Sequence, residues 1–369
     1  MRLAINASYS GVKTAALEAF TREVVQRLCR IDETTLVFSP VAIPGIDESN
    51  IVLTSEPPAA PAVSYFSNLM FNNTILPYQL AWHKADVLFC PATEFPFIDI
   101  LPMSVMIHDL DPLFYPERFG LEGEYFKTAL GHLHRQDIRA LVTTNYLKEQ
   151  LLNNTGVYLS NIDIVRLGLD ISEYKPVEDE LRRQLKKDFA ARMAIPAPYI
   201  LFFVDPDAPD GACDTVIAAF NDIKSRIRHS LLIVGKDKEP SNKIQYLGSV
   251  AVSDMPLLFT YADLLIESSD SVHILKAGAC GTPVIVSNIE PLPELVSDAG
   301  MLFNPSDFVF LSKLILMAIM NRNLRKEMID NGVRFAHRFS WENTAEDIYA
   351  SCSAAYAESY DRRRKSITH

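Results

Sequence analysis

The sequence is poor in cysteine, and its cysteines stand in no spacing that indicates a metal site or a disulfide framework. Five cysteines are scattered over 369 residues without a CxxC pair: Cys29, Cys90, Cys213, Cys280 and Cys352. Each lies among apolar residues, which predicts buried free thiols rather than metal ligands. We therefore expect neither a bound metal nor a cofactor, and a reducing compartment suits such a protein.

Long apolar runs are also missing. No stretch approaches the roughly 18 continuous apolar residues that a membrane span requires. The opening residues, MRLAINASYS, contain too short an apolar run for a signal peptide. These absences predict a cytoplasmic protein without a transmembrane segment.

Positive charge is in deficit. Lys and Arg total 35 against 46 Asp and Glu, for a formal net charge of −11. A nucleic-acid-binding protein needs a basic face to replace phosphate counterions, so this balance argues against a nucleic-acid partner. The balance gives no support to adhesion to anionic lipid either, although a local basic patch leaves peripheral association with the inner membrane face open.

What the sequence does contain is an alternation of short apolar runs with longer amphipathic stretches. Apolar runs that predict β-strands lie at residues 2–6, 35–38, 87–90, 103–107, 140–144, 162–165, 199–204, 230–234, 264–267 and 283–286. The helical patterns between them predict parallel sheets with helices on both faces, hence an α/β fold. The length of the chain favours two domains.

We expect two Rossmann-like, doubly wound domains that face each other across a cleft. The first covers residues 1–172 and the second residues 173–349, and a C-terminal helix at about 350–360 packs back on the first domain. Ligands of such sheets bind at the carboxyl ends of the strands, so the chemistry is expected in the cleft.

Five segments stand in the same order as the motifs of a known family. They are Ile107–Pro116, Leu141–Leu152, Ile164–Tyr174, Ala277–Val286 and Phe339–Glu342. The fourth, AGACGTPVIV, resembles the "EAMACGTPVI" segment of glycosyltransferase family 4, the retaining group 1 enzymes of the GT-B fold. This resemblance, which covers nearly the whole chain, implies transfer of a sugar from a nucleotide-sugar to a glycan or lipid-linked acceptor, without a metal.

The fourth segment contains the first donor-binding candidates. Gly281 and Thr282, followed by Pro283, turn the chain sharply between a helix and a strand. The small residues Ala277–Ala279 are expected to let this helix approach the ligand, with amide groups at its N-terminal end available to phosphate. A tight helix–strand connection without a ligand is the structural alternative.

The family holds the donor diphosphate with an Arg and a Lys in a "GRLxxxKG" pattern after the first strand of the second domain. In this sequence Pro206 replaces the Arg and Gly211 replaces the Lys. Asp205, Asp207 and Asp210 make the segment acidic, whereas the usual site neutralises charge on the leaving phosphate. The resemblance therefore implies a degenerate donor site.

The family also carries two glutamates beside the donor sugar and the ribose. The two glutamates are eight residues apart, and the corresponding positions in this sequence are Ser268 and Lys276. Glu267 and Asp270 flank Ser268, so a shifted carboxylate could reach the sugar. Lys276 offers a cation for phosphate, with a solvated or ion-paired lysine as the structural alternative. We take Ser268, Asp270 and Lys276 as donor-binding candidates.

In the first domain His108 is the catalytic candidate. It follows an apolar strand directly, and the resemblance implies a place beside the donor sugar. The alternative is a histidine bonded to Asp109 or Asp111 as part of a helix cap. The remaining candidates, for the acceptor side or the loop after the first strand, are Gly11, Lys13, Asp109 and Arg166.

Two functions stay open at this point. The first is an active glycosyltransferase with an altered site. The second is a catalytically inactive homologue that acts as a binding subunit or as the partner of another glycosyltransferase. Loss of one phosphate-neutralising donor costs about two to three orders of magnitude in turnover, so loss of several favours the second. An epimerase or phosphorylase of the same architecture is a distant third, because a fold does not fix a function.

Overall fold

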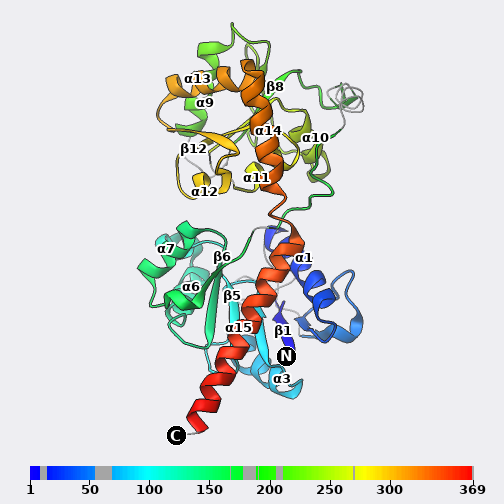
Figure 1. The fold of residues 1–369 in the computed structure, drawn as a ribbon, viewed down its shortest axis with the longest axis vertical. Helices are drawn as coiled ribbons and strands as arrows, with labels where there is room; N and C mark the ends of the chain where they lie inside the picture. Colours follow the sequence, from blue (N-terminus) through cyan, green and yellow to red (C-terminus); the bar gives the residue numbers. More distant parts are fainter. Residues whose placement is uncertain are drawn as a thin grey trace. The chain divides into compact units, whose positions relative to one another are not determined.

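The chain forms two compact units. In this computed structural model the first unit is Met1–Gly168 together with Trp341–His369, and the second is Leu169–Ser340 (Figure 1). The sequence analysis placed the boundaries after residues 172 and 349, so the start of the last helix belongs to the first unit instead. The residues that the structure describes are 1–8, 15–54, 69–166, 168–177, 188–189, 191–204, 211–268 and 271–367.

The first unit is built on a parallel sheet of seven strands in the order β3-β2-β1-β4-β5-β6-β7. The strands are β1 (Leu3–Asn6), β2 (Leu36–Ser39), β3 (Ile51–Leu53), β4 (Val87–Cys90), β5 (Met103–Met106), β6 (Ile138–Val142) and β7 (Ile162–Ile164). Six of them overlap the apolar runs of the sequence, and the edge strand β3 does not. The central strands are buried on both faces, as expected when helices cover a parallel sheet.

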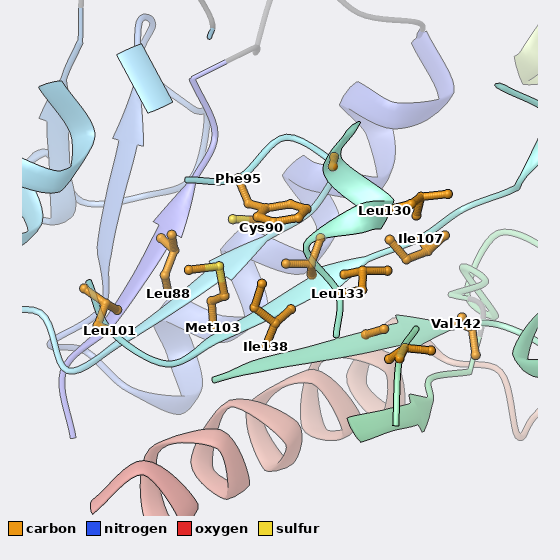
Figure 2. Packing of buried hydrophobic residues seen from close by; sticks show 14 of the residues in the cluster. Leu88, Cys90, Phe95, Leu101, Met103, Ile107, Leu130, Leu133, Ile138 and Val142 are labelled. Carbon is orange, nitrogen blue, oxygen red and sulfur yellow. The ribbon is translucent and has the colours of Figure 1, made fainter. Parts of the chain in front are cut away.

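Alternate residues of this sheet serve two separate hydrophobic clusters. Leu88 and Cys90 of β4 belong to one cluster, while Val87 and Phe89 belong to the other. This follows from the period of two, which points successive side chains of a strand to opposite faces. Figure 2 shows the first cluster, with Leu88, Cys90 and Phe95 among its labelled members.

Helices and short helical turns cover both faces of the first sheet. They are α1 (Ala15–Ile31), η1 (Glu48–Asn50), η2 (Phe71–Ile75), α3 (Leu76–Trp82), α4 (Asp111–Phe114), α5 (Pro116–Phe119), α6 (Leu121–Gly131), α7 (Asn145–Asn154), η3 (Leu159–Asn161) and α15 (Trp341–Ile367). The long α15 packs against α1 and the strands β4, β5 and β6. It buries Ile348, Cys352 and Ala355 in the second cluster.

A buried polar network fixes α15 to the sheet. Arg139 of β6 donates to both carboxylate oxygens of Asp163, at 2.9 and 2.8 Å, and to Glu358 of α15 at 2.8 Å. Ser351 of α15 donates to the same Asp163 at 2.6 Å. Burial disfavours the charged form of Asp163, but the bonds from Arg139 and Ser351 outweigh it and lower the pKa of this carboxyl.

The second unit is built on a parallel sheet of six strands in the order β10-β9-β8-β11-β12-β13. The strands are β8 (Tyr199–Phe203), β9 (Ser230–Val234), β10 (Ile244–Leu247), β11 (Leu264–Glu267), β12 (Val284–Ser287) and β13 (Gly300–Phe303). Its helices are α9 (Gly211–Ile223), η4 (Val252–Asp254), α10 (Met255–Tyr261), α11 (Ser271–Ala279), α12 (Leu292–Val296), α13 (Phe308–Met320) and α14 (Arg322–Ala336). The two edge strands, β10 and β13, were not predicted from the apolar pattern.

Two glycines bring α11 and α14 into close contact. A Cβ added to Gly278 would lie 3.1 Å from the carbonyl oxygen of Gly332, and one added to Gly332 would lie 3.4 Å from the Cα of Gly278. The small-residue run Ala277–Ala279, which we expected to bring the helix close to a ligand, therefore serves helix packing. It also lies at the C-terminal end of α11, away from the free amide groups of the first turn.

The cysteines are free thiols, as predicted. Cys90, Cys213, Cys280 and Cys352 are buried, and Cys29 is half-buried. Burial raises the pKa of the Cys29 thiol to about 11 and that of Cys352 to about 12, so both stay protonated and inert. Among the described residues no helix combines the length and the apolar character needed to cross a membrane.

Candidate functional site

Both sheets share one strand order. Numbered from the start of each unit, both contain the order 3-2-1-4-5-6, so the first and fourth strands are neighbours. In such sheets ligands bind at the carboxyl ends of these two strands, where the connections leave toward opposite faces. The candidate positions are therefore the ends of β8 and β11 in the second unit and of β1 and β4 in the first.

In the second unit, the last residue of β11 is a buried glutamate, and it marks the candidate position. Glu267 is fully buried, and its Oε1 accepts a hydrogen bond from the backbone N–H of Ser268 at 2.8 Å. Its Oε2 lies 3.0 Å from Nδ1 of His273, in the first turn of α11. Because an ionised carboxylate can only accept, Nδ1 of His273 carries a proton.

The His273 ring is also fixed by an aromatic neighbour. Its centroid lies 3.9 Å from that of Phe203, the last residue of β8, with an angle of 29° between the planes. Phe259 of α10 lies 5.9 Å from the same ring. His273 therefore spans the ends of the two central strands, and 17% of its side chain is exposed to solvent.

The candidate Ser268 lies at this same edge of the sheet. Its carbonyl oxygen accepts a hydrogen bond from the hydroxyl of Ser287, the last residue of β12, at 3.3 Å. The structure thus brings Ser268 together with Glu267 and His273. Asp270 and Pro206 lie outside the described residues, and Gly211 begins α9.

Lys276 lies further along α11, and its ammonium group contacts an aromatic ring. The Nζ atom is 5.3 Å from the centroid of Tyr174, a contact in the range of a cation–π interaction. Tyr174 is buried, and its burial raises the pKa of the phenol well above the usual range. This contact gives Lys276 a structural role, and its part in donor binding stays a prediction.

Gly281 and Thr282 lie at the opposite edge of the sheet. Gly281 has a φ of +74° and its N–H donates to the carbonyl of Gly278 at 3.0 Å, so it reverses the chain after α11. Thr282 is buried, and its hydroxyl donates to the carbonyl of Phe259 at 2.6 Å. Both residues precede β12, which places them at its amino end, so the donor contacts predicted for them do not fit this geometry.

Buried amide side chains mark the corresponding position in the first unit. Asn6, the last residue of β1, is fully buried and donates from Nδ2 to Oδ1 of Asn72 at 2.9 Å and to the carbonyl of Glu94 at 3.0 Å. Nδ2 of Asn72 and Oγ of Ser8 are buried without a hydrogen-bond partner among the described residues. Since buried polar atoms are normally satisfied, these two atoms indicate a place for a polar ligand or water.

His108 lies just after β5, at the same edge as Asn6. Its Nε2 is 2.8 Å from the carbonyl oxygen of Pro91, and its ring meets that of Phe20 edge to face at 4.9 Å. Burial lowers the pKa of His108, although the bond to Pro91 and the charge of Asp109 oppose this. The ring is therefore neutral at pH 7, with its proton on Nε2 and its lone pair on Nδ1.

The remaining first-unit candidates are less closely associated with this edge. Asp109 is exposed and accepts a bond from the backbone N–H of Asp111 at 3.1 Å, so the capping alternative applies to Asp109 and not to His108. Arg166 pairs with Asp347 of α15, at 2.8 Å for Nε and 2.5 Å for Nη2, and this pairing raises the pKa of the arginine. Its charge is thus already matched. Gly11 and Lys13 lie outside the described residues.

Comparison with known proteins gives a family match within the second unit. Residues 186–335 match the model of the family described as "Glycosyl transferases group 1". The matched region contains Glu267, Ser268, His273 and Lys276, so the edge described above lies within it.

Two curated relatives resemble the chain in sequence. O-antigen chain mannosyltransferase B of Escherichia coli is 38% identical over 112 residues, which are 29% of this chain and 29% of that protein. D-inositol 3-phosphate glycosyltransferase of Salinispora arenicola is 25% identical over 251 residues, which are 59% of this chain and 56% of that protein. The chain thus spans less than two thirds of the length of either relative.

A solved structure resembles nearly the whole chain in fold. Anabaena HepE in complex with UDP-glucose superposes with a TM-score of 0.66, over 96% of this chain and 100% of that chain, at 16% identity. At this identity the likeness concerns the fold, which is GT-B with two Rossmann-like units.

Sequence reasoning missed three residues at these edges. His273 stands in the segment SSDSVH, where the family has glycines and a glutamate, and no motif marks it. Asn6 and Asn72 are far apart in the sequence, and only the fold brings them together. The available signal was a polar residue at the end of an apolar strand, which holds for Asn6 and Glu267 alike.

Proposed function

We propose that this protein is a glycosyltransferase that transfers a sugar from a nucleotide-sugar to a glycan or lipid-linked acceptor, with retention of configuration. The observation that carries the proposal is one edge of the sheet in the second unit. There Glu267 ends β11, and His273 bonds to it and stacks on Phe203 at the end of β8. A Rossmann-type sheet receives a phosphate-containing ligand at this position, beside the N-terminus of a helix.

The relatives support the classes of donor and acceptor. The Anabaena protein of the same fold is in complex with UDP-glucose, and the Escherichia coli relative is an O-antigen chain mannosyltransferase. A nucleotide-sugar donor and a glycan acceptor are therefore the first substrates to test.

In the first unit His108 is proposed to bind a sugar hydroxyl. Its Nε2–H is engaged by the Pro91 carbonyl, which leaves Nδ1 as the acceptor. A neutral imidazole held in one tautomer by a backbone carbonyl is preorganised for this contact. The buried atoms of Ser8 and Asn72 at the same edge supply further hydrogen-bonding capacity.

An inactive, partner-binding homologue is the second candidate. It is favoured by Ser268 and Lys276, which stand where the family has its two glutamates, and by the contact of Lys276 with Tyr174. A protein of this kind can retain the fold and the ligand edge while turnover is lost.

The test is slow hydrolysis of nucleotide-sugars by the full chain. UDP-, GDP- and ADP-sugars are offered in turn, and NMR follows the released sugar before its anomers equilibrate. One nucleotide-sugar is expected to be consumed, with the donor's anomeric configuration kept in the product. The His108→Ala variant should be slower by about 100-fold, the usual effect of losing one positioned catalytic hydrogen bond.

The matched control is His134→Ala, which removes an exposed histidine bonded to the carbonyl of Gly131 and should leave the rate unchanged. Nucleotide binding without any hydrolysis or transfer across the panel would favour the inactive homologue. Release of the inverted anomer would contradict the retaining assignment.

A further inference from the structure

We propose that His273, oriented by Glu267, binds the diphosphate of the donor and compensates for the cations that the sequence lacks. The inference rests on the proposed function, since it names the phosphate-binding residue of the same site. Neither residue stands where the two glutamates of the family fall, since those positions are Ser268 and Lys276 in this chain.

The position of His273 is the first reason. It lies in the first turn of the nine-residue helix α11, where backbone N–H groups have no partner within the helix. Its ring covers Phe203 at the end of β8 and reaches Glu267 at the end of β11. The side chain is thus at the point where the sheet directs a phosphate toward a helix N-terminus.

Glu267 is the positioning residue. Glu267 is fully buried, and a buried carboxylate is destabilising unless hydrogen bonds compensate for it. Here Oε1 accepts from the Ser268 N–H and Oε2 accepts from Nδ1 of His273. This bond fixes the tautomer and leaves Nε2 as the ring nitrogen that does not face Glu267.

The charge of the pair supplies the chemistry. In its protonated form the imidazole is a cation whose Nε2–H can donate to a phosphate oxygen. The same atoms stabilise the charge that develops on the leaving diphosphate when the bond from the sugar carbon to the phosphate oxygen breaks. Pro206 and Gly211 stand where the family supplies this charge with Arg and Lys.

A second histidine–carboxylate pair provides a matched control. His229 lies just before β9 and its Nε2 is 3.4 Å from Asp263, just before β11, with 13% of the histidine side chain exposed. The exposure is close to that of His273, but this pair lies at the amino ends of the strands, where no phosphate is expected.

The experiment compares nucleoside diphosphates with nucleosides by calorimetry. The full chain is titrated with UDP and uridine, GDP and guanosine, and ADP and adenosine, and the ratio of the two dissociation constants gives the contribution of the diphosphate. His273→Ala and His273→Gln should weaken diphosphate binding by about 10- to 100-fold while nucleoside binding stays the same. Glu267→Gln should change the ratio in the same direction, and His229→Ala should not change it.

The outcomes separate the two proposals. A wild-type protein that binds none of the diphosphates would overturn the proposed function and this inference together. A wild-type protein that binds one of them, with an unchanged ratio in folded His273→Gln, would overturn only the role of His273. A global structural effect of the substitution is recognised because it weakens nucleoside and diphosphate equally, and this result also counts against the inference.

Discussion

At the scale of single residues, each of the two candidate edges contains a histidine that a hydrogen bond holds in one tautomer. His273 donates from Nδ1 to a carboxylate, whereas His108 donates from Nε2 to the carbonyl of Pro91. The first ring lies beside a carboxylate, whereas the second lies beside a neutral carbonyl, and burial lowers the pKa of His108. The two edges are therefore proposed for different tasks, a diphosphate in one unit and a sugar hydroxyl in the other.

The lowered pKa of His108 predicts a pH dependence of stability. Since the folded protein holds this ring neutral, the unfolded chain binds more protons once the pH falls below about 6.5, the ordinary value for histidine. The stabilising effect of His108 is thus complete above that pH and is lost progressively as the pH falls toward the folded-state value. We expect the free energy of unfolding of the wild type to fall more steeply than that of His108→Gln between about pH 7.5 and 5.

Tryptophan fluorescence during urea unfolding measures this difference for the first unit, which contains His108. The two tryptophans of the chain, Trp82 and Trp341, both belong to the first unit, so the signal reports its unfolding alone. Parallel pH profiles of wild type and His108→Gln would show that His108 is not held neutral by the fold.

At the scale of elements, the apolar pattern predicted the central strands and the edge strand β7, and it missed the other three edge strands. β3, β10 and β13 are partly exposed strands of three or four residues, so their apolar runs are too short or too interrupted to stand out. The buried central strands do show such runs, because helices cover both of their faces. The sequence analysis assigned the first residues of α15 to the second unit, whereas Trp341 packs against Phe20 and Gly168 of the first, a tertiary contact that no local pattern encodes.

The join between Gly168 and α15 gives a prediction at this scale. A Cβ on Gly168 would lie 1.9 Å from Cε3 of Trp341, a clash that cannot be relieved by a small shift. Gly168→Ala should therefore destabilise the first unit by about 3 kcal/mol, the upper range for overpacking. Urea unfolding followed by tryptophan fluorescence measures it, and Trp341 itself reports on the altered contact.

Gly131→Ala is the control for that change. Gly131 ends α6, and an added Cβ there would have no atom within 4 Å. The substitution should leave stability unchanged or raise it by up to about 1 kcal/mol, because alanine restricts the unfolded chain. Equal effects of the two substitutions would mean that the contact with Trp341 is not rigid.

At the scale of the whole molecule, two doubly wound units could be argued from the sequence, whereas the sites could be argued only in part. Alternation of strands and helices, with motifs in order, indicated two doubly wound units. The same reasoning placed Ser268 and His108 after apolar strands, where the structure has them, and their part in binding stays a prediction. It misplaced Gly281 and Thr282, because a family motif does not tell which edge of the sheet a residue occupies. It missed His273 because the pairing with Glu267 depends on the tight path from β11 into α11.

The measurement that tests the account most directly is hydrogen exchange of the full chain with and without a saturating nucleoside diphosphate. We predict slower exchange at the carboxyl ends of β8 and β11 and in the first turn of α11, around Phe203, Glu267 and His273. Exchange around Gly281 and Thr282, at the other edge of the sheet, should not change. Protection of Gly281 and Thr282 without protection of the α11 first turn would contradict the assignment of the donor site.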